Sequence, residues 1–218
     1  MAFAVIDNLA DQPSAQRAAD NYRELAVNYD ATCKRVDALR IEVIQMLNLQ
    51  PRETVFEIAC GTGSILPLLA AAVGTDGHVT GVELSAEMAA QAAKRVAHLP
   101  QATVVQTSML DFLPSEKADA VLLCYAQDVL QCTKAVDRMI ATAKPGARIA
   151  MVGMQTLPWL WGWPVNLFNL YRARRYLTTY VNMDKPWRLL EQRGAQLRLV
   201  RTALWGSAYL VVGNLPVR

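Results

Sequence analysis

The residues best suited to chemistry lie close together at positions 55–63, where a short apolar run leads into a turn rich in glycine. Glu57 places a carboxylate within the apolar run, and Gly61 and Gly63 follow it in the turn. A glycine has no Cβ, so backbone N–H groups in such a turn can approach a ligand closely. A helix that starts directly after the turn adds the partial positive charge of its N-terminus. The pattern predicts a ligand-binding loop between a strand and a helix.

A second carboxylate, Glu83, lies 20 residues beyond Gly63, at the end of the next apolar run. A carboxylate at that position can accept hydrogen bonds from the two vicinal hydroxyls of a ribose. Two ligand classes use a glycine turn together with such an acid, namely dinucleotides and S-adenosylmethionine. A dinucleotide loop has the pattern G-x-G-x-x-G, and Leu66 stands where its third glycine belongs. The loop therefore favours S-adenosylmethionine.

Four cysteines and two histidines are the other reactive side chains. None of the cysteines forms a CxxC pair, so a structural zinc site is not expected. Cys60 and Cys124 end strands that would be neighbours, and we interpret Cys60 as a small loop residue rather than a nucleophile. A thiolate site for a soft metalloid is the alternative. His78 and His98 are interpreted as surface or helix-end residues, which leaves no histidine as a general base.

The elements that must position these residues follow from the hydrophobic pattern, which alternates between strands and helices. Residues 118–124 are apolar enough to form a strand covered on both faces, and Ser85 is the expected N-cap of a helix. Strands that alternate with helices predict a parallel sheet, and two last apolar runs predict a hairpin. The expected strands are residues 54–58, 78–83, 102–106, 118–124 and 148–153, the expected helices are 14–29, 36–47, 64–73, 85–99 and 133–143, and the hairpin is 196–203 with 208–212.

Length and composition agree with one folded domain. The chain has 218 residues, 53% of them hydrophobic, and a formal net charge of +3, which excludes a disordered chain. Four cysteines in this length exclude a disulfide-stapled scaffold, and 11 Gly with 10 Pro exclude a collagen-like repeat. A chain of this size suits one sizeable α/β domain and is short for two.

The charge is unevenly distributed along the chain. Residues 157–218 contain nine basic and two acidic residues, a net charge of +7, so the rest of the chain carries −4. An uncharged run at 149–171, which holds three tryptophans, leads directly into this basic region. This order leaves two interpretations of residues 159–175. They form either a peripheral contact with a membrane surface or a wall of a substrate site.

Other partners and compartments are less favoured by the sequence. The uncharged run is not expected to span a membrane, because Pro158 and Pro164 interrupt it. The basic cluster is short and the overall charge small, so nucleic acid is not an expected partner. Residues 1–10 lack the pattern of a secretory signal, and a cytoplasmic protein is expected.

Four segments in order carry a resemblance to a known family. Residues 59–63 resemble motif I of the class I S-adenosylmethionine-dependent methyltransferases, 81–85 their motif II, 119–124 their fourth-strand motif and 144–146 the turn before their fifth strand. The similarity covers residues 52–153 and is closest to the small-molecule methyltransferases of ubiquinone and menaquinone biosynthesis. It implies an α/β fold with a Rossmann-like, mostly parallel seven-stranded sheet, helices on both faces and a C-terminal antiparallel hairpin. Within one domain of residues 1–218, we expect a helical cap at 1–50, a cofactor-binding core at 51–156, a substrate lid at 157–195 and the hairpin at 196–218.

The resemblance also assigns cofactor-binding roles to single residues. Glu57 and the backbone of the turn would hold the methionine end of the cofactor, and Glu83 would hold the ribose. Ser108 stands where the family often has an acid that contacts the adenine amino group, so that either Ser108 or Asp111 would replace it. The cofactor-binding candidates are Glu57, Ala59, Cys60, Gly61, Gly63, Glu83, Leu84, Met88, Ser108, Met109, Cys124 and Tyr125, and no metal is expected.

The family places an N-terminal helix over the cofactor, which points to Tyr22 and Tyr29; with Asp128 these are the candidates for catalysis. The resemblance implies transfer of a methyl group from S-adenosylmethionine to a small, partly apolar acceptor, with S-adenosylhomocysteine as the second product. A sulfonium is a good leaving group, so the protein must mainly position the acceptor and exclude water. The lack of a histidine base favours an acceptor that needs little deprotonation.

Two alternatives to methyl transfer stay open from the sequence. One is an enzyme of the same fold that binds S-adenosylmethionine and catalyses a reaction other than methylation. The other is a non-enzymatic, membrane-peripheral binding module. The identity of the acceptor and the oligomeric state are not predicted.

Overall fold

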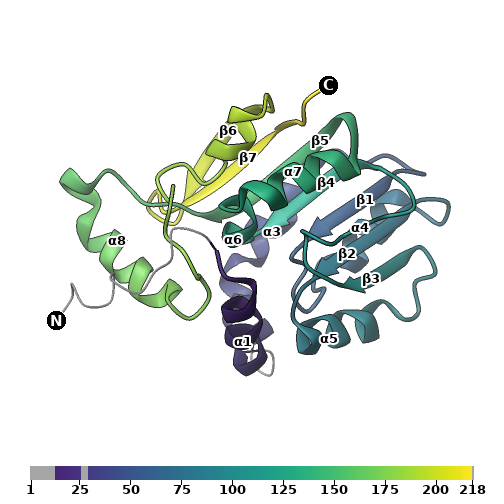
Figure 1. Ribbon diagram of the computed structural model, residues 1–218, viewed down its shortest axis with the longest axis horizontal. Helices are drawn as coiled ribbons and strands as arrows, with labels where there is room; N and C mark the ends of the chain where they lie inside the picture. The colour runs from purple at the N-terminus through teal and green to yellow at the C-terminus, as the bar shows by residue number, and fades with distance from the viewer. Residues whose placement is uncertain (1–12, 26–28, 218) are drawn as a thin grey trace.

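The computed structural model describes residues 13–25 and 29–217. Among these residues, seven strands form one sheet in the order β3-β2-β1-β4-β5-β7-β6 (Figure 1). β1 to β5 run parallel, whereas β7 pairs antiparallel with both β5 and β6. This arrangement confirms the expected α/β fold. The strands are β1 Thr54–Ile58, β2 His78–Glu83, β3 Ala102–Gln106, β4 Ala118–Cys124, β5 Ala143–Met154, β6 Gln196–Ala203 and β7 Ala208–Asn214.

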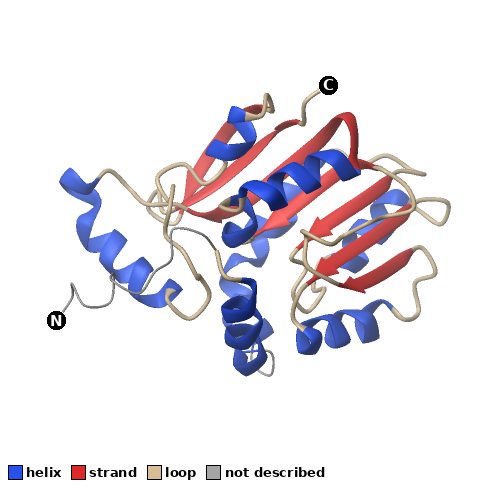
Figure 2. Cartoon of the chain, viewed as in Figure 1, coloured by secondary structure: helices blue, strands red, loops and turns tan. Residues whose placement is uncertain are grey.

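Helices cover both faces of the sheet (Figure 2). Successive strand residues point to opposite faces, so Phe56 packs with α6, α7 and α9, while Val55 packs with α3, α4 and α5. Each face therefore has its own apolar core. The helices are α1 Ala15–Leu25, α2 Tyr29–Cys33, α3 Asp37–Leu47, α4 Leu66–Val73, α5 Ala86–Val96, α6 Gln127–Leu130, α7 Thr133–Thr142, α8 Trp159–Ala173 and α9 Arg188–Gln192, with a 3-10 turn, η2, at Lys34–Val36.

Most element bounds follow from the sequence, and the exceptions have local reasons. β1, β2, β3, β4 and β6 have the expected bounds, and Ser85 caps α5 by accepting a hydrogen bond from the Met88 N–H. β5 begins at Ala143, five residues earlier than expected, because Ala118 of β4 pairs with Ala143. The expected turn at 144–146 is therefore an irregularity within a longer strand, with Gly146 at a φ of 74°.

The expected helix at 14–29 is divided in the structure. α1 ends at Leu25 and α2 begins at Tyr29, and residues 26–28 lie outside the described residues. α1 lies beside α5, to which it is linked by an ion pair of 3.1 Å between Arg23 and Glu87. α2, η2 and α3 then carry the chain to the sheet, where α3 contacts β5 and β7. The N-terminal helices thus pack on the rest of the fold at two places, α5 and the β5–β7 part of the sheet.

α8 occupies the tryptophan-rich stretch and extends away from the sheet at one end of the molecule (Figure 1). Its buried residues are small or polar, namely Gly162, Asn166 and Ala173. A Cβ on Gly162 would lie 2.3 Å from the Cβ of Leu157, so only glycine permits this close packing. Among the described residues, no helix has both the length and the hydropathy needed to cross a membrane.

Candidate functional site

The glycine turn after β1 has a backbone that depends on glycine. Ala59, Gly61 and Gly63 all have positive φ angles, of 57°, 57° and 69°. A Cβ on Gly63 would lie 2.8 Å from the Cβ of Ala92, so this glycine is needed for α5 to pack against the turn. A Cβ on Gly61 would approach only Tyr29, at 3.5 Å from its Cε1. Gly63 therefore serves packing, while Gly61 presents bare backbone to the space beside Tyr29.

Glu83 joins the end of β2 to the glycine turn. Its Oε2 accepts a hydrogen bond of 2.9 Å from the Gly61 N–H, and its Oε1 accepts one of 2.8 Å from the Ser85 N–H. Burial raises the pKa of this carboxyl above its usual range, and the backbone donors oppose that effect. Each carboxylate oxygen has two lone pairs, so the two backbone bonds leave acceptor capacity for a ligand with two hydroxyls.

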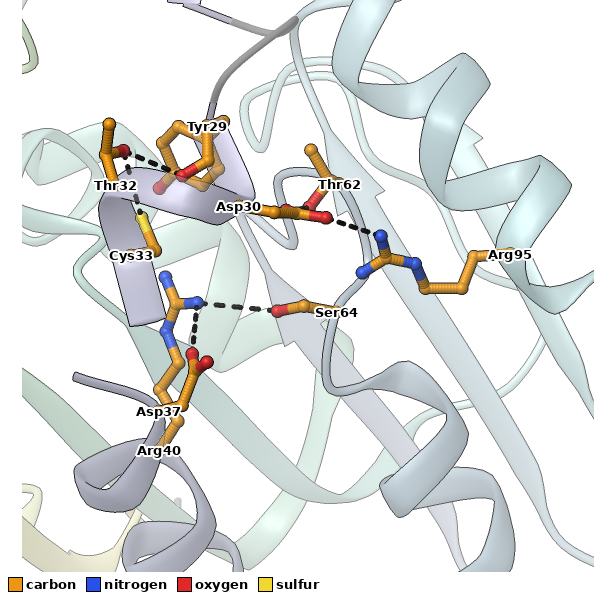
Figure 3. Close-up of polar contacts among 9 residues, drawn as sticks. All are labelled: Tyr29, Asp30, Thr32, Cys33, Asp37, Arg40, Thr62, Ser64 and Arg95. Atoms are coloured by element: carbon orange, nitrogen blue, oxygen red, sulfur yellow. Dashed lines mark hydrogen bonds and ion pairs between the residues drawn. The ribbon is translucent and has the colours of Figure 1, made fainter. Parts of the chain in front are cut away.

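The N-terminal helices α2 and α3 contact the glycine turn and the residue after it through polar side chains. Asp30 of α2 accepts hydrogen bonds from Thr62 Oγ1 at 2.5 Å and from Arg95 of α5 at 2.6 Å (Figure 3). Burial alone would raise the pKa of Asp30, but the hydrogen bonds from Thr62 and Arg95 lower it below its usual value. Asp30 is therefore an ionised bridge between three elements. Arg40 of α3 adds a second link, a hydrogen bond of 3.4 Å to Ser64 Oγ.

A cavity lies at the carboxyl ends of β1, β2 and β4, which is where ligands bind in open parallel sheets. Its volume is about 150 Å³, and most of its exposed lining is apolar. Glu83, Gly61 and Asp128 line this cavity, and most of the residues around them are apolar. We refer to it as the first cavity. The sequence-predicted residues that line it are Tyr22, Tyr29, Ala59, Gly61, Glu83, Leu84, Ser108, Met109, Cys124, Tyr125 and Asp128.

Four of the predicted cofactor-binding residues do not line this cavity. Gly63 and Met88 are packing residues, since Gly63 faces α5 and Met88 is fully buried in that helix. Cys60 is buried on the other face of the sheet, where its thiol approaches Gly81. Glu57 is also absent from the cavity wall, and its buried Oε2 has no hydrogen-bond partner among the described residues. A direct role of these four in cofactor binding stays a prediction.

Glu57 and Arg40 are both buried, and the charge of Arg40 acts on the Glu57 carboxyl without an ion pair between them among the described residues. Burial raises the pKa of Glu57 to about 8, an effect that Arg40 opposes and Glu83 strengthens. Arg40 itself is almost fully buried and lies 5.9 Å from the centroid of the Tyr125 ring. Arg40 was not predicted from the sequence, because its role depends on where α3 packs.

Three tyrosines close the first cavity. The rings of Tyr22, Tyr29 and Tyr176 lie 6.0 to 6.5 Å apart, in edge or tilted contacts. Burial raises the pKa of Tyr22 and Tyr29 well above their usual value. Both are therefore neutral at physiological pH, where a phenol can donate a hydrogen bond but cannot remove a proton. Tyr176 was not predicted from the sequence; its ring reaches the site from the segment that follows α8.

Asp128, the third catalytic candidate, connects two segments. Its carboxylate accepts hydrogen bonds from both the backbone N–H and the hydroxyl of Thr178, the latter at 2.7 Å. The Ser14 N–H in turn donates to the Thr178 hydroxyl at 3.0 Å. Burial raises the pKa of Asp128, and the bonds from Thr178 oppose that effect. Asp128 thus fixes the segment after α8 and the start of the N-terminal helices to the wall of the cavity.

A second and larger cavity adjoins the first. Its volume is about 650 Å³, within the usual range for small-molecule sites. Tyr22, Tyr29, Tyr125, Tyr176 and Leu177 line both cavities, so the two meet at the tyrosines. The rest of the wall is largely apolar and includes Val165 and Phe168 of α8, with three arginines, Arg35, Arg40 and Arg172. Among the described residues, no histidine lines either cavity and no group of side chains could hold a metal ion.

Comparisons with known proteins agree with this geometry. A family model described as a methyltransferase domain matches residues 55–146. A demethylmenaquinone methyltransferase from Symbiobacterium thermophilum is 28% identical over 150 residues, which cover 62% of this chain and 60% of that protein. A 2-phytyl-1,4-naphtoquinone methyltransferase from Synechocystis is 24% identical over 197 residues, which cover 85% of this chain and 80% of that protein.

Solved structures give the same fold. The N-methyltransferase NodS from Bradyrhizobium japonicum, in complex with S-adenosyl-L-homocysteine, superposes with a TM-score of 0.66 at 14% identity. The superposition covers 93% of this chain and 100% of that one. The first of the sequence relatives, by contrast, is matched over less than two thirds of its length.

Proposed function

We propose that this chain, which belongs to the class I S-adenosylmethionine-dependent methyltransferases, methylates a small, partly apolar acceptor bound in its second cavity. One observation supports this most directly. The cavity that holds Glu83 and the glycine turn adjoins a larger, mostly apolar cavity at the four tyrosines that line both. Such a pair of adjoining cavities can bring a cofactor and an acceptor together with water excluded between them.

The first cavity suits the cofactor in its chemistry. Glu83 is a buried carboxylate, already held by two backbone N–H groups, with lone pairs left for the ribose hydroxyls. Gly61 removes a side chain where the ligand must approach the backbone. Leu84 and Met109 supply apolar surface for the adenine ring. When bound, S-adenosylmethionine supplies an electrophilic methyl group on a sulfonium.

The second cavity suits an acceptor that carries an aromatic or aliphatic body. The apolar side chains of Val165, Phe168 and Leu177 would be in contact with such a body. The named relatives act on demethylmenaquinone and on 2-phytyl-1,4-naphthoquinone, both of which combine a ring system with an apolar tail. We propose an acceptor of this kind, a hydroxylated ring with an apolar substituent.

The charged residues of the second cavity bear on how the acceptor loses its proton. Tyr22 and Tyr29 are neutral and cannot act as bases at physiological pH. Arg35, Arg40 and Arg172 are cations in the wall of this cavity, and a nearby cation stabilises the anionic form of a bound hydroxyl. The arginines would therefore favour an ionised acceptor without a dedicated general base, while the tyrosines orient it.

A methyl-transfer assay tests this proposal. The protein is incubated with S-adenosylmethionine and a reduced naphthoquinone that carries a short apolar tail. We expect equal amounts of S-adenosylhomocysteine and methylated product, detected by mass spectrometry. Val165→Trp, which fills the second cavity, should raise the acceptor KM and leave the affinity for S-adenosylhomocysteine unchanged. Leu113→Glu, an exposed substitution outside the lining of both cavities, is the control. Product formation unaffected by Val165→Trp would refute the assignment of the second cavity.

A further inference from the structure

α8 has its polarity reversed relative to an ordinary surface helix. A helix on a globular protein buries its apolar side and exposes its polar side. In α8, Gly162, Asn166 and Ala173 face the protein, whereas the large apolar side chains face outward. Leu160 is 93% exposed and Trp161 63% exposed. The outward apolar residues are Trp159, Leu160, Trp161, Trp163, Leu167, Phe168 and Tyr171.

This reversed orientation is held in place by specific contacts. Asn166 accepts a hydrogen bond of 2.8 Å from the Leu157 N–H and donates one of 2.9 Å to the Leu157 carbonyl. Gly162 allows the helix to approach Leu157 so closely that a Cβ would clash. The inward side is therefore specified by hydrogen bonds and close packing. Rotating α8 to bury its tryptophans would break both.

A second exposed segment extends the same surface. The turn between β6 and β7 carries Leu204 and Trp205, and Trp205 is 93% exposed. Gln155 donates a hydrogen bond of 2.9 Å to the Gly206 carbonyl, which fixes this turn beside the chain that leads into α8. Leu204 and Trp205 line the second cavity together with Phe168 and Arg172 of α8. We call the outward face of α8 together with this turn the α8 surface, and it borders the second cavity at Phe168, Leu204 and Trp205.

Charge indicates what this surface contacts. Arg172, Arg174 and Arg175 lie at the C-terminal end of α8, exposed and without an ion pair among the described residues. Arg174 lies 4.1 Å from the centroid of the Tyr171 ring, and no acidic residue occurs between positions 157 and 183. Exposed tryptophans beside unpaired arginines are typical of a helix that lies in the interface of an anionic bilayer.

A second copy of the chain is the less favourable partner. In a two-fold dimer the same patch faces itself, so the arginines of two copies would meet without acidic partners in the patch. An anionic lipid surface instead supplies opposite charge to the arginines and an apolar layer to the tryptophans. We propose that the α8 surface docks on an anionic lipid bilayer and opens the second cavity toward it.

This proposal rests on the proposed function in one respect, because an acceptor with an apolar tail would then enter the second cavity from the bilayer. Docking itself is tested without turnover. The protein is mixed with phosphatidylcholine vesicles that contain or lack phosphatidylglycerol, and bound protein is separated by flotation at low and high salt. We expect binding to the anionic vesicles only, reduced by salt. Tryptophan emission should shift to shorter wavelength on binding.

Matched substitutions locate the contact. Leu160→Glu should lower the partition coefficient about tenfold or more, since it removes apolar burial and adds a repelled charge. Leu113→Glu, which changes another exposed leucine, should leave it unchanged. Arg174→Gln and Arg175→Gln should each lower it about fivefold, whereas Arg198→Gln on β6 should not. None of these residues lines either cavity.

Two flotation results would overturn docking: no binding to anionic vesicles at low salt, or equal loss of binding in the control variants. A dimer in sedimentation equilibrium would also overturn it, if Leu160→Glu dissociates that dimer and vesicles have no effect on it. Failure of the proposed function gives a different result. In that case the vesicles bind as expected, but S-adenosylhomocysteine gives no calorimetric signal and no acceptor is methylated. If both proposals hold, Leu160→Glu turns over a tailless, water-soluble acceptor normally and loses turnover of a vesicle-embedded one.

Discussion

Replacing Glu57 by glutamine should change how the stability of the protein depends on pH. Glu57 is buried near the end of β1, and its Oε2 has no hydrogen-bond partner among the described residues. Burial raises its pKa from 4.5 to about 8, with Arg40 lowering it and Glu83 raising it further. In the unfolded chain the carboxyl has its ordinary pKa, so between these two values the folded protein holds a proton that the unfolded chain releases.

The direction and size of the effect follow from this difference. A folded-state pKa above the unfolded one gives a contribution to stability that is complete below about pH 4.5 and is lost as pH rises through about 8. One pKa unit corresponds to about 1.4 kcal/mol. From pH 5 to pH 9 the free energy of unfolding of the wild type should therefore fall by about 4 kcal/mol more than that of Glu57→Gln.

Urea denaturation of the two proteins at several pH values between 5 and 9 measures this difference. Titrating groups that do not interact with Glu57 contribute equally to both proteins and cancel in the comparison. Glu116→Gln, at an exposed glutamate, is the matched control and should follow the wild type. Parallel stability profiles for wild type and Glu57→Gln would refute the inference that Glu57 is a protonated, buried acid at neutral pH.

Four further substitutions have defined outcomes. Gly61→Ala forces alanine into a positive φ and should lower the free energy of unfolding by about 1–2 kcal/mol. Gly74→Ala forces alanine into an extended conformation at positive φ and should lower it by about 1–3 kcal/mol. Isothermal titration should show weaker S-adenosylhomocysteine binding only for Gly61→Ala, because Gly74 does not line the first cavity; equal affinities would contradict this. Asp128→Asn should lower the free energy of unfolding by about 1–3 kcal/mol and speed hydrogen exchange at the Thr178 amide, whereas unchanged exchange would remove Asp128 from its role as a connector. Asn166→Ala leaves two backbone groups of Leu157 unpaired and should cost about 2 kcal/mol or more; an unaltered thermal midpoint would show that these bonds do not hold α8.

The fold was largely predictable because the signals that specify it are local. The bounds of β1 to β4 follow from short apolar runs that end at glycine or polar residues, and the N-cap Ser85 marks the start of α5. The glycine turn and Glu83 were recognisable because the ligand site depends on backbone geometry at adjacent strand ends. The early start of β5 was not predictable from local sequence, because its first residue is defined by pairing with Ala118 of β4.

The rest of the site depends on contacts between distant segments, which the sequence does not display. Arg40 and Tyr176 reach the site from α3 and from the segment after α8, and neither belongs to a motif. Glu57 adjoins the glycine turn in sequence but lies on the other side of the sheet from Ile58, because alternate strand residues face opposite ways. The outward apolar side of α8 was visible in composition, but its orientation depends on the contacts of Gly162 and Asn166 with Leu157.

Calorimetric titration of S-adenosylhomocysteine into the wild type and into Glu83→Gln measures whether Glu83 binds the cofactor. Glutamine keeps one acceptor oxygen at the glycine turn but loses the charge and the second oxygen. We expect binding of one ligand per chain in the wild type and a loss of affinity of about tenfold or more in the variant, as for a charge-assisted hydrogen bond. Absence of binding to the wild type, or equal affinity in both proteins, would contradict the account.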